Sequence, residues 1–282
     1  MESIVAGTDG SPCATTAVEW AAHEAERRRR ALHIVHAAEH RGSGIPFHPA
    51  VGSLGSLTEI GERILAEAAV RAAKECPELR ITTEVIFEAP VYALRARAEH
   101  AYEVVVGHRG LGGFSALLLG STSLRIAGHT PCPVVVVRGE TDESRGEVLV
   151  GVDLSEESAI VLEHAFEAAA IRGAWVRAVH AWPVPSTVYA DADPVTVRRA
   201  TAEVQRLLGQ MVEPWRERFP DVKVIEQPLP GHPVERLAES SRRADLLVVG
   251  SAGHDSRCFG SVVHGVIHHA DCPITVVGHR SP

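Results

Sequence analysis

The sequence predicts a doubly wound α/β fold that occurs twice along the chain. Short apolar runs, such as residues 104–106, alternate with stretches of helical spacing, as in layered folds where strands and helices succeed one another. These runs are continuously apolar, which is typical of a parallel sheet buried on both faces. A third observation, a long internal repeat, indicates two copies of this arrangement.

The repeat is visible as pairs of residues at nearly constant separation. Asp9, Ser11, Glu19 and His36 match Asp153, Ser155, Glu163 and His180, each 144 positions later. The separation falls to 143 for Gly107 and Gly250, and to 140 for Gly120 and Gly260. A repeat of this length has the size of a domain rather than of a solenoid unit. We therefore expect domains at residues 1–139 and 146–282, joined by a linker rich in Glu, Asp, Ser and Gly.

Five strands are expected in the first half. They cover residues 4–7, 32–37, 80–87, 104–107 and 134–137. Between the first two strands, Ser11 and Pro12 supply a helix N-cap and a proline at the first helical position. The small apolar residues that follow at helical spacing, and that predict close packing on the sheet, are Ala14, Ala17, Val18, Ala21, Ala22 and Ala25. Residues 41–56 are expected to form a loop, before a helix over about residues 57–75.

Composition and charge argue against several classes of protein. The net charge of −8 over 282 residues disfavours a general nucleic-acid binder. No run approaches the roughly 18 apolar residues of a membrane helix, and the N-terminus lacks the pattern of a signal peptide. Five cysteines without a C-x-x-C pair fit a reducing compartment. We expect a cytoplasmic protein that binds neither nucleic acid nor a membrane.

The strongest candidate for a ligand site is a glycine spacing in the first half. Its residues are Gly107, His108 and Gly110, followed after nine residues by Gly120, Ser121, Thr122 and Ser123. Glycines between a strand and a helix let backbone N–H groups approach an anion, and the helix start adds its positive dipole end. We expect a phosphate cradle, with the hydroxyls of Ser121 and Ser123 as donors. The alternative is a purely structural turn with an N-cap.

A carboxylate ends the first strand of each half, at Asp9 and Asp153. Ligands of doubly wound sheets bind beyond the carboxyl ends of the strands, so this carboxylate could accept from ribose hydroxyls or hold a metal-bound water. The alternative is that each aspartate caps the following helix. Its recurrence together with Gly107 and Gly250 favours the binding role.

The second copy of the glycine motif is altered. The positions that it retains are Gly250, Gly253, Gly260 and Ser261. Its gap is six residues rather than nine, Val263 replaces Ser123, and Asp255 enters the loop. A carboxylate near a polyphosphate is repulsive by roughly 1 to 4 kcal/mol, and a lost donor costs about 0.5 to 1.5 kcal/mol. We expect the second half to bind nucleotide weakly or not at all.

On these residues the chain resembles the universal stress protein family in its tandem two-domain form. The resemblance rests on Asp9, on the G-x2-G-x9-G-S spacing and on the closing Cys132-Pro133-Val134 segment, and it covers both halves nearly end to end. It implies two Rossmann-like domains, similar to adenine nucleotide alpha hydrolases, each with a five-stranded, mostly parallel sheet and helices on both faces. It also implies dimerisation through the last strand of each domain.

The same resemblance implies that ATP is bound without a Walker lysine, alone or with Mg²⁺. The aspartate would contact the ribose, backbone near Ala37 would read the adenine, and the Gly-Ser segment would hold the phosphates. The sequence itself excludes a Walker site, because its only lysines, Lys74 and Lys223, lie far from the glycine motifs. His264 and His268 have i,i+4 spacing but no H-E-x-x-H pattern, so no metal site is expected.

These observations favour an ATP-binding, nucleotide-responsive regulator in stress response. No catalytic residue is expected, although weak ATP hydrolysis is left open. One alternative is a slow ATPase or nucleotidyl-transfer enzyme of the same superfamily, and another is a nucleotide-free protein-interaction module. The apolar runs 134–137 and 274–277 are expected edge strands, which would pair with each other within the chain, with a second copy in a homodimer, or both. A regulatory protein partner is also expected.

Overall fold

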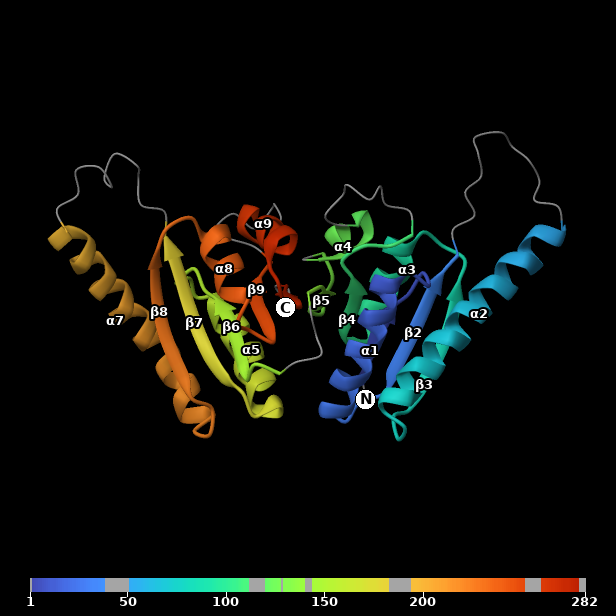
Figure 1. The fold of residues 1–282 in the computed structure, drawn as a ribbon, viewed down its shortest axis with the longest axis horizontal. Helices are drawn as coiled ribbons and strands as arrows, with labels where there is room; N and C mark the ends of the chain where they lie inside the picture. Colours follow the sequence, from blue (N-terminus) through green and yellow to red (C-terminus); the bar gives the residue numbers. More distant parts are fainter. Residues whose placement is uncertain are drawn as a thin grey trace. The chain divides into compact units, whose positions relative to one another are not determined.

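The computed structural model describes residues 2–38, 51–111, 120–127, 129–139, 144–182, 194–251 and 260–278. The chain divides into two compact units, and the division falls between Val137 and Arg138. Figure 1 shows each unit as a sheet with helices packed against it. Within the described ranges, no helix is both long enough and apolar enough to cross a membrane.

The first unit is built on five parallel strands. They are β1 (Ser3–Gly7), β2 (Leu32–Ala37), β3 (Ile81–Ile86), β4 (Ala101–Gly107) and β5 (Val134–Val137). Their order is β3-β2-β1-β4-β5, so the direction of winding reverses between β1 and β4. The helices are α1 (Pro12–Arg27), α2 (Val51–Glu75), α3 (Pro90–Ala98) and α4 (Ser121–Ile126). Helix α1 packs beside α2, and α3 beside α4.

The second unit repeats this topology. Its strands are β6 (Glu147–Gly151), β7 (Trp175–Trp182), β8 (Val224–Pro230), β9 (Leu246–Gly250) and β10 (Ile274–Val277). They are parallel and follow the order β8-β7-β6-β9-β10. The helices are α5 (Ser158–Arg172), α7 (Pro194–Arg218), α8 (Pro233–Ser241) and α9 (Ser261–His269). The predicted doubly wound α/β fold is therefore confirmed in both halves.

Helix α1 forms as its sequence predicts. The Ser11 side chain accepts a hydrogen bond from the backbone N–H of Ala14 at 3.2 Å, and Pro12 occupies the first helical position. The small residues of the expected apolar face, from Ala14 to Ala25, are all buried. Because these side chains are short, the helix axis lies close to the sheet, and its first turn reaches the ends of the strands.

Two element boundaries differ from the sequence prediction by more than one residue. The loop expected over residues 41–56 is too long, since α2 already begins at Val51. Gly52 and Gly55 did not prevent this, because extending a nucleated helix adds a hydrogen bond for each residue that is fixed. Strand β4 begins at Ala101 rather than at residue 104. Glu103 interrupts the apolar run there, but it is buried and interacts electrostatically with Arg28.

A charged network links β2, β3 and α3 in the first unit. Arg97 Nε donates to Glu84 Oε2 at 2.7 Å, and His33 Nε2 lies 3.0 Å from the same oxygen. The hydrogen bonds from Arg97 lower the pKa of Glu84 to about 2, although burial opposes this shift. The pKa of Glu84 in the folded protein lies below the ordinary pKa of a glutamate. Its charged carboxylate therefore stabilises the fold fully at pH values above that ordinary pKa. This contribution is lost as the pH falls toward 2.

Replacing Glu84 with glutamine should lower the free energy of unfolding by roughly 1 kcal/mol at pH 7, since the pair is partly exposed and screened. The difference between the variant and the original chain should shrink between pH 4.5 and pH 2. Urea unfolding followed by circular dichroism at several pH values measures both quantities. Glu67→Gln on α2 serves as the control, because it removes an exposed carboxylate that makes no ion pair with the described residues. A loss of stability that is equal at all pH values would contradict this account.

Candidate functional site

A cavity of about 340 Å³ opens at the carboxyl ends of β1 and β4, where the winding reverses. The structure brings most of the predicted first-half site residues to its wall: Asp9, Ala37, Gly107, Gly110, Gly120, Ser121, Thr122 and Ser123. His108 does not line it. Its ring contacts other residues, with Nδ1 3.2 Å from the carbonyl oxygen of Val137 and Nε2 3.8 Å from the sulfur of Cys13.

Gly107 lies where α1 approaches the sheet most closely. A Cβ atom at this position would lie 2.6 Å from the carbonyl oxygen of Cys13 and 3.0 Å from the backbone nitrogen of Ala14. Both are backbone atoms of the first helical turn, so they cannot move aside without shifting the helix. The glycine is therefore required by packing, whether or not a ligand is bound.

Asp9 ties the end of β1 to the glycine segment. Its Oδ1 accepts from the backbone N–H of Ser11 at 3.0 Å, and its Oδ2 accepts from the backbone N–H of Leu111 at 2.7 Å. A Cβ atom on Gly110 would collide with the same Oδ2. The helix N-cap is Ser11, so Asp9 does not cap the helix as the alternative explanation supposed. A carboxylate has about four lone-pair sites, which leaves Asp9 able to accept further bonds from the cavity.

The Gly-Ser segment closes the cavity on its other side. The backbone N–H of Gly120 donates to the carbonyl oxygen of His108 at 2.7 Å, and α4 begins at the next residue. Ser123 is buried and donates its hydroxyl proton to the carbonyl oxygen of Gly107 at 2.7 Å. That proton is used within the protein, which differs from the expectation that both serine hydroxyls would donate to a ligand. Ser121, by contrast, is exposed.

Arg109 is a wall residue that the sequence analysis did not single out. It is exposed, and it is the only lysine or arginine among the described residues that line this cavity. Its Nε donates to His108 Nε2 at 3.3 Å. Arg109 could have been identified from the sequence, because it is the positively charged residue between Gly107 and Gly110.

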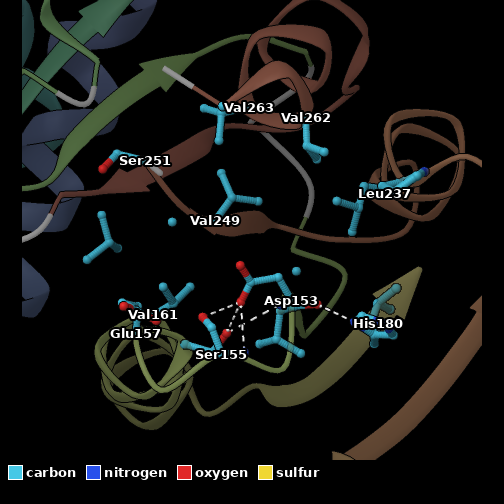
Figure 2. A pocket seen from close by; sticks show the side chains of 18 of the residues that line it. Asp153, Ser155, Glu157, Val161, His180, Leu237, Val249, Ser251, Val262 and Val263 are labelled. Atoms are coloured by element: carbon cyan, nitrogen blue, oxygen red, sulfur yellow. Dashed lines mark hydrogen bonds between the residues drawn. The ribbon is translucent and has the colours of Figure 1, made fainter. Parts of the chain in front are cut away.

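The second unit has a smaller cavity at the corresponding place, of about 210 Å³ (Figure 2). Asp153, Gly250, Gly260 and Ser261 line it, as the repeat predicts, whereas Gly253 and Asp255 lie outside the described residues. The backbone N–H of Gly260 donates to the carbonyl oxygen of Ser251 at 3.2 Å. This bond corresponds to the one between Gly120 and His108, so both glycine segments close in the same way despite their different lengths.

The carboxylate of Asp153 in the second cavity already accepts hydrogen bonds from its own unit. Asp153 Oδ1 accepts from Ser155 N at 3.0 Å, Ser155 Oγ at 2.5 Å and Ser158 Oγ at 2.8 Å (Figure 2). Burial alone would raise the pKa of Asp153, but these bonds lower it below its ordinary value. The side chain is therefore negatively charged at neutral pH and is oriented toward two serines of its own unit.

The wall of the second cavity is also more acidic and more apolar than that of the first. Glu157 lines it at the position that Cys13 holds in the first unit. Val262 and Val263 stand in place of Thr122 and Ser123 (Figure 2). None of the described residues around this cavity is a lysine or an arginine. The second cavity therefore lacks a described counterpart to the cation Arg109.

Two histidines hold equivalent structural positions. His36 Nδ1 lies 2.9 Å from the carbonyl oxygen of Thr8, and His180 Nδ1 lies 2.8 Å from that of Val152. In this geometry each Nδ1 donates its proton to the end of the neighbouring first strand. The bond fixes the position of that strand end, and with it the aspartate that follows.

Comparison with known proteins gives the same result for both halves. Residues 1–138 and 145–278 each match the model of the universal stress protein family. A universal stress protein of Mycolicibacterium smegmatis is 32% identical over 289 residues, which cover 98% of this chain and 97% of the relative. One of Mycobacterium tuberculosis is 32% identical over 300 residues, covering 97% and 94%. The crystal structure of a universal stress protein from Archaeoglobus fulgidus is 18% identical, with a TM-score of 0.74 over 98% of this chain and 96% of that one.

The close approach at Gly107 predicts a stability effect that can be measured without a ligand. Gly107→Ala should lower the free energy of unfolding by about 1–3 kcal/mol, because the new methyl group overlaps backbone atoms of α1. Urea unfolding followed by circular dichroism measures this change.

The matched control is Gly209→Ala on α7, where a Cβ atom would meet nothing within 4 Å. That change should stabilise the protein by about 0.5–1 kcal/mol, because alanine is the better helix former. Equal effects of the two substitutions would show that Gly107 is not constrained as described.

Proposed function

The chain belongs to the universal stress protein family, and we propose that it is a nucleotide-responsive regulator whose first cavity binds ATP. The proposal rests mainly on one observation. Asp9, Arg109 and Ser121 line one cavity, at the point where the winding of the sheet reverses. A cavity of about 340 Å³ lies within the range of small-molecule sites.

Each of several residues in this wall is suited to contact a different part of ATP. Asp9 keeps acceptor capacity for ribose hydroxyls. Arg109 offers a guanidinium to phosphate oxygens, and hydrogen bonds between such charged groups are among the stronger ones in proteins. Ser121 and Thr122 add hydroxyls at the start of α4, where backbone N–H groups also face outward. Ala37 lines the cavity at the end of β2 and is proposed to contact the adenine through its backbone.

We propose that the second cavity binds nucleotide much more weakly. Asp153 and Glu157 give its wall a negative charge, and the described part of that wall holds no lysine or arginine to offset it. Val262 removes the hydroxyl that Thr122 brings to the first cavity. A polyphosphate placed there would lose donors and meet repulsion.

We propose a role as a bound effector rather than as a substrate. The described residues that line the first cavity include no histidine and no cysteine, the side chains most used as bases and nucleophiles at neutral pH. A ligand changes a protein's activity by binding one of its conformations more tightly than another. Gly110 lines the cavity next to the hydrogen bond between Asp9 and Leu111, and it is the part of the wall on which we propose that ATP acts.

The cation of the cavity gives the sharpest test of this proposal. Arg109→Gln should weaken ATP binding by roughly ten- to a hundredfold, because a charge-assisted hydrogen bond contributes about 1.5–3 kcal/mol. Adenosine, which lacks phosphates, should bind the variant and the original chain equally well. Isothermal titration with both ligands measures these affinities. Because the side chain of Arg109 is exposed, the variant should fold like the original chain.

Arg125→Gln is the matched control, since Arg125 is exposed on α4 but does not line the cavity. It should leave both affinities unchanged. Nucleotide released by denaturing the purified protein should be intact ATP. Release of ADP that forms by turnover would favour the enzyme alternative, and unchanged ATP affinity in Arg109→Gln would contradict the assignment of the phosphate contact.

A further inference from the structure

Three metal-ligating side chains meet in the first unit, far along α1 from the cavity. His23 and Glu26 lie one turn apart on α1, and Cys76 directly follows α2. Their donor atoms all lie within 4.8 Å of one another. The histidine is half-buried, the glutamate is exposed and the cysteine is fully buried, so the cluster reaches from solvent to the core.

The spacing of one donor pair is close to that of a tetrahedral zinc site. Cys76 Sγ lies 3.6 Å from His23 Nδ1. A zinc ion holds sulfur at about 2.3 Å and nitrogen at about 2.0 Å, and two such ligands at a tetrahedral angle lie about 3.5 Å apart. The pair therefore already has the separation that an ion between its atoms would impose. Glu26 supplies a third donor, and a water molecule would complete the tetrahedron.

A fourth side chain supports the histidine. The His23 Nε2 atom, on the far side of the ring, lies 3.7 Å from the carboxylate of Glu75. Histidines that bind metals through one ring nitrogen usually direct the other N–H toward a carboxylate, which fixes the ring and its tautomer. Arg27 is a cation that interacts electrostatically with Cys76, and its guanidinium lies 3.8 Å from the carboxylate of Glu24.

The free thiol is held in its protonated form. Burial raises the pKa of Cys76 to about 11, and the carboxylates of Glu26 and Glu75 act in the same direction. A divalent cation would reverse this, since it replaces the thiol proton. The sulfur–metal bond forms, the S–H bond breaks, and the proton leaves to solvent without any change of oxidation state.

Among the described residues of the second unit, no such cluster stands at the corresponding place. Phe219, which follows α7, stands where Cys76 stands in the first unit, and its ring packs 5.8 Å from that of Phe166. Glu167 and Ala170 take the positions of His23 and Glu26. At this position the second unit has packed aromatic rings, whereas the first unit brings together a thiol, an imidazole and a carboxylate.

We propose that His23, Glu26 and Cys76 bind one zinc ion per chain, with Glu75 orienting the imidazole. Sulfur, nitrogen and carboxylate oxygen together favour zinc over magnesium or calcium, which prefer oxygen alone. The ion would join the end of α2 to α1. This site is independent of the proposed nucleotide cavity, and neither proposal depends on the other.

Cobalt provides a spectroscopic test on the full-length, untagged protein. After removal of metals under reducing conditions, Co²⁺ should produce a thiolate-to-cobalt charge-transfer band that saturates at one equivalent per chain. Zinc should then abolish the band by displacement. His23→Gln should weaken cobalt binding at least tenfold, whereas His100→Gln, which removes an exposed histidine elsewhere, should leave it unchanged.

Cys76→Ser should remove the band altogether. If burial of this position prevents that variant from folding, His23→Gln and Glu26→Gln still decide the question, because both change side chains that reach solvent. The proposal is overturned if no thiolate band appears at one equivalent. It is equally overturned if the band persists with unchanged affinity in His23→Gln, since another cysteine would then be the ligand.

Discussion

The close approach of α1 to the end of β4 is the constraint on which the site depends. The small residues along α1 let the helix lie near the sheet, and Gly107 leaves room for the backbone of Cys13. A similar restriction holds on the other face, where a Cβ on Gly7 would lie 3.1 Å from the side chain of Leu94. Because the helices press against the strand ends from both faces, the backbone at this edge is fixed. The carboxylate of Asp9 and the glycine segment are thereby held across one cavity.

The two units share one topology, but the walls of their cavities differ. Both close the glycine segment with the same backbone hydrogen bond, and both fix the first strand end through a histidine. They differ in the side chains placed on this shared backbone. Asp9 reaches across to Leu111, whereas Asp153 accepts hydrogen bonds from Ser155 and Ser158. Charge and hydrogen bonding, rather than the fold, therefore distinguish the two cavities.

Much of this arrangement follows from local patterns in the sequence. Strands β2 and β5, the Ser11 cap and the buried face of α1 were predicted correctly, because continuous apolar runs and helical spacing are local signals. The bond from Ser123 to Gly107 depends on how α4 docks on β4, and no spacing rule reveals it. The cluster at Cys76 was missed for a related reason. Its ligands are separated by a whole strand and helix, so only the packing of α1 on α2 brings them together.

We propose one ATP site per chain, located in the first unit. The most direct test is calorimetric titration of the full-length protein with ATP, followed by cross-linking with a photoreactive ATP analogue and mapping of the labelled peptides. We expect one ATP per chain, with label confined to peptides from residues 2–127. Two sites of comparable affinity, or label mainly in residues 144–278, would contradict it.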